Sequence, residues 1–354
     1  MNYRKRIAVE VVMGLLLICG FYLVLKARNN ALWPSNRIEL DSGYHEVMGT
    51  FAHIAAVTMN QETAKKCIET ALEQIQLVDK LMSDYKSDSE ISRVNQDAFR
   101  HPVRVGSMTF EVLQRAVKFS RLSDGAFDVT IGPLVDLWHR AGESNSLPTQ
   151  AQRQQAKSKV GYEKLLLDPN RMTVKFAVDG MRLDLGAIAK GYSVDLAIEA
   201  MQQLGALGGM VDVGGDIRCF GAPPPGKKTW LIGIQDPRKA EDWPGTGRPL
   251  MVLHVVNAAV VTSGNYRRFV SVKGKKHSHI IDAGAGESSE QLASVTIIGN
   301  NATDADALAT AVSVLGAEKG IQSIKTIPGT EAILITGAPE FKVIKTSGAA
   351  QYIQ

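Results

Sequence analysis

Hydrophobic residues recur along this chain of 354 residues with two different periods, which predict two kinds of element. Over residues 60–82 apolar side chains return every three or four positions, which predicts an amphipathic helix. Asn60 and Glu62 suit its N-terminal turn. Similar stripes follow Ser107, ending near residues 123–125, and run over residues 188–204. We interpret these stripes as helices that pack against a core.

Shorter apolar runs, broken by turn residues, predict strands. They lie at residues 49–54, 165–167, 173–176, 181–185, 210–220, 230–235, 251–256, 259–262, 269–272 and 295–298. Polar composition marks surface loops at residues 142–148, 223–228 and 236–249. Hairpin-like strand pairs with flanking helices predict an α+β fold with mixed, largely antiparallel sheets, rather than a doubly wound parallel sheet.

The first 28 residues differ from the rest of the chain. Residues 7–25 are apolar apart from Glu10, and as a helix they would span about 28 Å, close to the hydrocarbon thickness of a bilayer. The flanking basic residues favour, by a small margin, a cytoplasmic N-terminus and an exported folded domain. We therefore expect one N-terminal transmembrane helix within residues 1–28, a linker over residues 29–42 and a folded domain over residues 43–354. A cleaved signal peptide and lipid attachment at Cys19 are the alternatives.

Composition narrows the function classes. The 45% of hydrophobic residues suffices for a sizeable core. Forty basic and 36 acidic residues are spread along the whole chain without a basic block, which argues against nucleic acid as a partner. Cys67 and Cys219 are too few for a disulfide framework and are interpreted as small buried hydrophobes.

A possible metal site lies in residues 301–312. A helix starting near Thr303 would place Asp306 and Thr310 one turn apart. A carboxylate and a hydroxyl in this arrangement can share Mg²⁺, which takes oxygen ligands and keeps positions open for water or phosphate. Acidic residues also suit the first turn of any helix, because the helix dipole favours them there. The residue types alone leave both interpretations open.

Residues 183–192 read as a strand that passes through a glycine turn into a helix. Amides at such a helix start can hold a phosphate, Lys190 would add charge, and Asp184 could bond a polar ligand group. An ordinary strand-to-helix turn fits equally well. His279, beside a strand, suits a general base or a phosphate contact, or is simply a surface histidine. Asp212 and Asp216 are not expected to be direct ligands.

Taken together and in order, these segments resemble the ApbE family of FAD:protein FMN transferases. The resemblance covers roughly residues 43–335. It is carried by residues 48–50, 81–95, 124–134, 183–191, 211–221, 262–266, 279–282 and 304–316.

The resemblance implies Mg²⁺-dependent transfer of FMN from FAD to a threonine or serine hydroxyl of an acceptor flavoprotein, with release of AMP. It implies that Asp306, Thr310 and the backbone carbonyl of Ala187 bind the metal. His279 and Asp306 would be catalytic, with His279 acting on the acceptor hydroxyl. The residues implied to contact FAD are Met48, Tyr85, Ala126, Phe127, Asp128, Asp184, Lys190 and His279.

The resemblance also implies a partner and a location. The acceptor would be an exported or membrane-bound flavoprotein with an Asp-Gly-x-Ser/Thr-Gly-Ala-Ser/Thr type signal. The chain would sit in the bacterial inner membrane, with its catalytic domain on the periplasmic or extracytoplasmic side. Two alternatives remain open, namely an FAD pyrophosphatase that yields FMN and AMP, and an exported flavin-binding protein without catalysis. A tyrosine at the position of Tyr85 goes with transfer in this family.

Two segments depart from the family pattern. After His279 the pattern has a proline and a threonine, whereas this chain has Asp282-Ala283-Gly284-Ala285-Gly286, so we expect a looser loop. Asn265 stands where an acidic residue is usual, which removes one negative charge near the expected flavin side.

Overall fold

The computed structural model describes residues 33–242, 248–266 and 268–353. An eight-stranded sheet forms its centre, in the order β1-β2-β6-β7-β10-β15-β16-β17, and all its neighbouring strands run antiparallel. These strands are β1 Ile38–Val47, β2 Thr50–Thr58, β6 Gly208–Val213, β7 Asp216–Gly221, β10 Ala258–Gly264, β15 Leu292–Gly299, β16 Glu331–Thr336 and β17 Val343–Lys345.

Smaller sheets surround the central one. Three strands form the order β3-β5-β4, and three two-stranded hairpins pair β8 with β9, β11 with β12, and β13 with β14. Their bounds are β3 Val103–Arg104, β4 Leu165–Asp168, β5 Thr173–Phe176, β8 Trp230–Ile234, β9 Met251–Val255, β11 Phe269–Val272, β12 Lys275–Ser278, β13 Ile281–Asp282 and β14 Glu287–Ser288. The predicted α+β fold with largely antiparallel sheets is confirmed.

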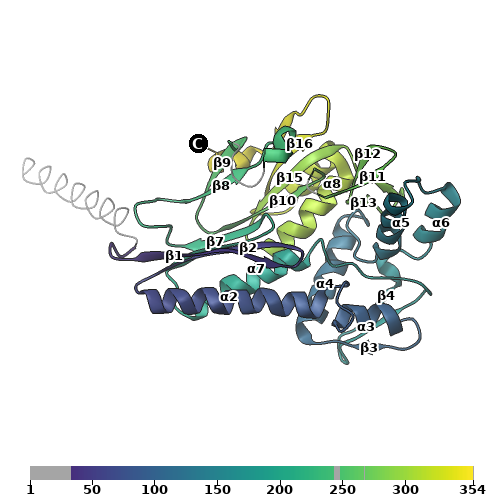
Figure 1. Ribbon diagram of the computed structural model, residues 1–354, viewed down its shortest axis with the longest axis horizontal. Coiled ribbons are helices and arrows are strands. Elements are labelled where there is room, and N and C mark those ends of the chain that lie inside the picture. Colours follow the sequence, from purple (N-terminus) through teal and green to yellow (C-terminus); the bar gives the residue numbers. More distant parts are fainter. Residues whose placement is uncertain (1–32, 243–247, 267, 354) are drawn as a thin grey trace, which may run out of the picture.

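The central sheet has an apolar layer on each face, because side chains alternate along a strand. In β2, Ile54 and Ala56 join one core, and Ala55 and Val57 join the other. The first core lies under three helices, α2 Gln61–Met82, α7 Ala189–Gln203 and α8 Ala302–Lys325. The second is covered by β8, β9 and the 3₁₀ turn η3 Ser347–Tyr352. Figure 1 shows α2 and α7 on one side of the sheet and the β8–β9 hairpin on the other.

The remaining helices gather at one end of the molecule (Figure 1). They are α3 Glu90–Asp97, α4 Ser107–Leu122, α5 Gly132–Glu143 and α6 Gln150–Lys157, with short 3₁₀ turns η1 Tyr162–Lys164 and η2 Pro237–Asp242 elsewhere along the chain. The predicted helices at residues 60–82, after Ser107 and at 188–204 are confirmed. Asn60 caps α2, because its side chain accepts the Thr63 N–H.

The predicted strand over residues 181–185 is wrong. This segment is extended, but among the described residues it forms an isolated bridge between Arg182 and Ile131 and no strand of a sheet. The side chain of Asn95 takes the place of a neighbouring strand, since its Oδ1 accepts the Leu183 N–H at 2.7 Å and its Nδ2 donates to the Leu183 carbonyl at 3.0 Å. An amide side chain can satisfy one residue of backbone in this way without forming a sheet.

Three further boundaries differ from the predictions. The run at residues 210–220 is two strands, β6 and β7, joined by Gly214 and Gly215, both with positive φ. The predicted linker of residues 29–42 ends early, because Ile38 already pairs with Thr58 in the sheet. The predicted membrane segment at residues 7–25 lies outside the described residues. Within the described ranges, no helix has the length and apolar character needed to cross a bilayer.

Candidate active site

The start of α8 is fixed by an aspartate from α7. Both oxygens of Asp195 accept hydrogen bonds from this helix start, at 2.9 Å from the Ala302 N–H and at 2.9 Å from the Thr303 N–H. Asn301 caps the same helix by accepting the Asp304 N–H at 2.8 Å. Amides that have no partner inside the helix are thereby satisfied. The docking of α8 on α7 sets the position of Asp306, one turn further along.

Three charged side chains from three elements meet beside this turn. Lys190 of α7 places Nζ 2.7 Å from Oδ2 of Asp216 in β7 and 3.5 Å from Oδ2 of Asp306 in α8. Both carboxylates are only 2% exposed. Burial and, second, the nearby charge of Asp216 raise the pKa of Asp306 to about 8, although Lys190 acts in the opposite direction. Burial likewise raises the pKa of Asp216. With both acids ionised, one ammonium faces two carboxylates, so the cluster lacks one positive charge.

Gly191 allows α7 and α8 to approach closely enough for this contact. A Cβ at Gly191 would lie 2.3 Å from the Ala302 carbonyl oxygen and 2.9 Å from Cβ of Asp306. Without a side chain, the Gly191 N–H reaches Oδ2 of Asp306 at 3.1 Å. The Asp306 carboxylate is therefore held by the first turn of α7. Asp304, in contrast, is half exposed and is the acidic residue that merely decorates the start of α8.

The oxygen donors here suit a hard divalent cation. Thr310 follows Asp306 by one helical turn, and Ala187 lies in the turn that leads into α7. In the part of the chain that the structure describes, no three His, Cys, Asp or Glu side chains converge on a metal position. A cation beside Asp306 would therefore need hydroxyl, carbonyl and phosphate oxygens to complete its shell, which is the donor set that Mg²⁺ favours.

Arg268 links the β1–β2 hairpin turn, which contains Met48, to His279. The β1–β2 hairpin turns at Met48 and Gly49, whose φ values of 52° and 64° fit a two-residue type I′ turn. Arg268 donates from Nη2 to the Gly49 carbonyl at 2.9 Å. Its own carbonyl lies 2.9 Å from Nδ1 of His279. A carbonyl can only accept, so Nδ1 carries the proton and Nε2 is the basic nitrogen.

The environment of His279 favours its neutral form. Burial of the ring is the largest cause of its lowered pKa, and the charges of Arg268 and Lys190 lower the pKa further. The Arg268 carbonyl and Asp184 act in the opposite direction. His279 remains at the surface, so a ligand can reach it. A neutral imidazole with Nε2 available is the form that a general base requires.

Tyr85 stands at the rim of the site, above a group of charges. Its side chain is 79% exposed. Partial loss of solvent around the hydroxyl and then the charges of Asp84 and Asp184 raise the pKa of Tyr85, while Arg182 and Arg268 lower it. Arg182 bonds Asp84 through Nη2, and Asp184 accepts the Gly186 N–H at 2.8 Å. The charges of Asp184 and Arg268 thus act on both Tyr85 and His279.

These features agree with comparisons to known proteins. The sequence model of the ApbE family matches residues 48–334. The chain belongs to the ApbE family. It is 34% identical to the FAD:protein FMN transferase of Haemophilus influenzae, over 78% of this chain and 81% of that one.

Solved ApbE structures share the fold. The ApbE protein of Thermotoga maritima superposes with a TM-score of 0.79 at 29% identity, covering 90% of this chain and 99% of that one. The flavin transferase ApbE of Vibrio cholerae superposes with a TM-score of 0.75 at 28% identity, covering 89% of this chain and 99% of that one.

Within this ApbE-family chain, Phe127 and Asp128 lie apart from the charged cluster. Phe127 is 1% exposed in the main core. The Asp128 carboxylate accepts hydrogen bonds from the Thr130 N–H at 2.8 Å, the Thr130 hydroxyl at 2.7 Å and the Tyr162 N–H at 2.9 Å. The Val129 carbonyl, next in the chain, accepts the Asp184 N–H at 2.8 Å. The segment with Ala126 therefore supports Asp184 through the backbone.

The loop after His279 is tighter than predicted, so the expectation of a loose loop is wrong. Oδ1 of Asp282 accepts the Gly284 N–H at 2.7 Å and the Ala285 N–H at 3.1 Å. The Gly286 N–H donates to the Asp282 carbonyl at 2.7 Å, and Gly286 has a φ of 71°. Asp282 and a glycine with positive φ thus hold the turn without proline. Asn265 donates from Nδ2 to the Leu292 carbonyl at 3.0 Å.

The sequence allowed Asp216 to join a site without being a direct ligand, and Arg268 was not singled out. The structure puts Asp216 against Lys190 and puts Arg268 between the hairpin turn and His279. One signal for Asp216 was available, since an acidic residue directly after a Gly-Gly turn opens this strand. Arg268 gave no such signal, because its side chain bonds the backbone carbonyl of distant Gly49 and it reaches His279 through its own backbone carbonyl.

Proposed function

We propose that this chain transfers FMN from FAD to a threonine or serine hydroxyl of an acceptor protein, with release of AMP, and that the transfer requires Mg²⁺. The observation that carries the proposal is the buried pair of carboxylates, Asp216 and Asp306, for which Lys190 is the one cation in ion-pair contact among the described residues. A site of this kind gains most from a divalent cation next to an anionic substrate. The name of the Haemophilus influenzae relative supports the same reaction.

The proposed step is a substitution at phosphorus. The acceptor hydroxyl oxygen forms a bond to the FMN phosphorus, the bond from that phosphorus to the oxygen of AMP breaks, and AMP leaves with the electron pair. The hydroxyl proton goes to Nε2 of His279, whose other nitrogen is held by the Arg268 carbonyl. Water in place of the hydroxyl would give free FMN and AMP, which is the pyrophosphatase alternative.

Asp306, Thr310 and the Ala187 carbonyl would hold Mg²⁺, which when bound neutralises charge on the pyrophosphate. Lys190 adds a fixed positive charge and is kept in place by Asp216. The protein thus stabilises charge through groups that are oriented before the substrate arrives.

The flavin end of FAD would lie along the rim formed by Met48 and Tyr85, with Asp184 bonding a polar group of the substrate. Ala126, Phe127 and Asp128 contribute by fixing the backbone that carries Asp184. We also propose that residues 1–28 anchor the chain in the inner membrane. Residues 43–354 would then meet an exported or membrane-bound acceptor on the periplasmic side.

The test combines the protein with FAD, Mg²⁺ and an acceptor domain that carries an Asp-Gly-x-Ser/Thr-Gly-Ala-Ser/Thr signal. We expect the acceptor band to fluoresce after denaturing electrophoresis, with one AMP released per flavin attached. An acceptor whose hydroxyl residue is replaced by alanine is the control and should stay dark. A dark native acceptor together with free FMN and AMP would favour hydrolysis, and FAD that stays intact by mass spectrometry would favour a non-catalytic binder.

A further inference from the structure

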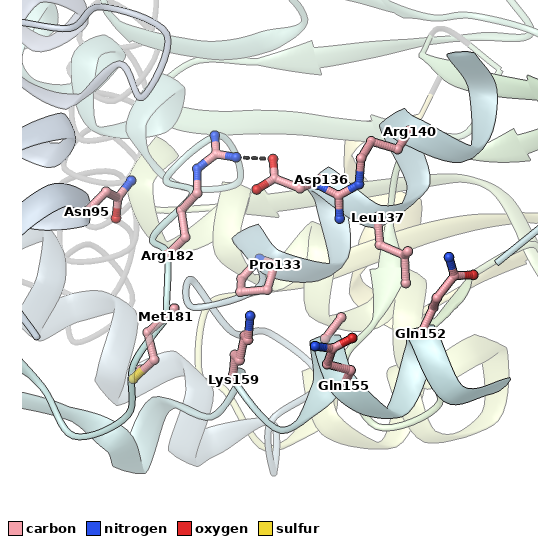
Figure 2. A pocket seen from close by; sticks show the side chains of 12 residues that line it. Asn95, Pro133, Asp136, Leu137, Arg140, Gln152, Gln155, Lys159, Met181 and Arg182 are labelled. Atoms are coloured by element: carbon pink, nitrogen blue, oxygen red, sulfur yellow. Dashed lines mark hydrogen bonds and ion pairs between the residues drawn. The ribbon is translucent and has the colours of Figure 1, made fainter. Parts of the chain in front are cut away.

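A cavity of about 430 Å³ lies between α5, α6 and residues 180–182. Arg182 belongs both to this cavity and to the site described above. One end of its guanidinium bonds Asp136 in the cavity wall, and the other end bonds Asp84 beside Tyr85. Figure 2 shows the Asp136–Arg182 pair on one side and Arg140, Gln152, Gln155 and Lys159 around the rest of the cavity.

The cavity wall carries positive charges that are not neutralised by ion pairs among the described residues. Arg182 is balanced by Asp136 and Asp84. Arg140 and Lys159, in contrast, form no ion pair with any residue in the described ranges. The Gln152 side chain accepts the Thr149 N–H through Oε1 at 2.8 Å, so its amide NH₂ remains a donor. The wall therefore offers two cations and further donors to an anionic group.

These groups stand on firmly packed elements. Leu134, Leu137 and Ala156 join α5 to α6 in a small core of their own. Lys159 passes over Gly180, where an added Cβ would lie 2.9 Å from its Nζ. Gly180, with a φ of 75°, thus leaves room for the ammonium at the cavity wall. Packing therefore sets the spacing of the two helices beside the cavity before an anion binds, which lowers the entropic cost of binding.

We propose that this cavity binds an acidic segment of the acceptor protein, separate from the segment that carries the modified hydroxyl. The inference rests on the proposed function, since only a protein acceptor has a second segment to dock. The described residues that line the cavity include no aromatic side chain, so nothing there stacks on an adenine or flavin ring. Carboxylates of the acceptor that bind Arg140 and Lys159 would place it next to Arg182. Arg182 in turn bonds Asp84, beside Tyr85.

The first experiment measures binding without turnover. Its probe is a fluorescein-labelled hexaglutamate peptide, followed by fluorescence anisotropy at low salt, with a hexaglutamine peptide for comparison. We expect the intact protein to prefer hexaglutamate, and the double variant Arg140→Glu, Lys159→Glu to bind it about tenfold more weakly. The charge-matched control Arg171→Glu, Lys227→Glu alters exposed residues away from the cavity and should bind as the intact protein does.

Equal binding by both double variants would overturn the proposal. Displacement of the peptide by inorganic phosphate or AMP, at an ionic strength where sodium chloride has no effect, would identify a small-anion site and would also overturn it. The neutral variant Arg140→Gln, Lys159→Gln should lie between the intact protein and the charge reversal.

The second experiment measures transfer. We expect the charge-reversed variant to show a KM for the acceptor domain raised about tenfold, with an unchanged KM for FAD, and the difference to shrink at high salt. An unchanged KM for the acceptor would contradict the proposal. Failure of the intact protein to flavinylate any acceptor would refute the proposed function alone, because the peptide experiment needs no turnover.

Discussion

The raised pKa of Asp306 makes stability depend on pH in a direction that can be measured. The group titrates near 3.8 in an unfolded chain and near 8 in the fold. Because the fold binds this proton more tightly, the stability linked to it is fully present below pH 3.8 and is lost as pH rises through 8. Each pKa unit corresponds to about 1.4 kcal/mol, so the loss between pH 5 and pH 8 is about 4 kcal/mol.

Substitution of Asp306 by asparagine removes this titration while keeping the shape of the side chain. In urea unfolding with EDTA, we expect the unfolding free energy of the intact protein to fall by about 4 kcal/mol from pH 5 to pH 8. The Asp306→Asn variant should show a much flatter profile and should exceed the intact protein at pH 8. The control Asp304→Asn changes the half-exposed acid on the same helix turn and should keep the full slope.

Mg²⁺ supplies the second half of this test. The ion requires the ionised carboxylate, so at pH 8 and at a hundredfold excess over its Kd it should stabilise the intact protein by about 2.7 kcal/mol. The Asp306→Asn variant should gain almost nothing. Parallel pH profiles for the intact protein and this variant would refute the account of the buried cluster. Equal stabilisation of both by Mg²⁺ would refute Asp306 as a ligand.

Three further predictions concern the packing around the site. The Arg268→Gln change removes a positive charge that lowers the pKa of His279. In a pH profile of kcat/KM, the rise on the acid side should therefore move to higher pH. A rise that stays at the same pH would exclude His279 as the base. In Gly191→Ala the new Cβ would collide with the Ala302 carbonyl, and urea unfolding should show a loss of about 3 kcal/mol. In Asn95→Ala two hydrogen bonds to an extended backbone segment disappear, which should cost about 2 kcal/mol in the same assay, whereas a loss below 0.5 kcal/mol would mean that water replaces them.

The parts of the fold that sequence predicts are those whose signals are local. The helix at residues 61–82 has a seven-residue apolar stripe and an asparagine cap next to it, so both its existence and its start are readable. The extended segment at residues 181–185 has the alternating apolar and polar pattern that is typical of a strand. Whether it enters a sheet depends on Asn95, which is 88 residues away from Leu183. The short helices α3 and α6 were not predicted, because they carry cap residues, Ser89 and Thr149, but little apolar periodicity.

The candidate site divides in the same way. Asp306 and Thr310 lie on one helix, so their spacing is visible in the sequence, and Lys190 follows a recognisable glycine turn. The charged neighbours of Asp306 are not visible in the sequence, because Asp216 comes from strand β7, far away along the chain. The role of Arg268 depends on backbone carbonyls of Gly49 and of its own residue. Side chains that act through distant backbone leave no pattern in a single sequence.

The contact between Gly191 and Asp306 also has a consequence for biosynthesis. Residues that are 115 positions apart must meet before the anionic cluster exists, and the strand that carries Asp216 is seated between β6 and β10. A nascent chain that stops short of α8 therefore lacks the carboxylate that would bind the metal. If the body is exported as proposed, nucleotide binding would begin only after almost the whole chain has crossed the membrane, and an unfinished chain would not consume FAD in the cytoplasm.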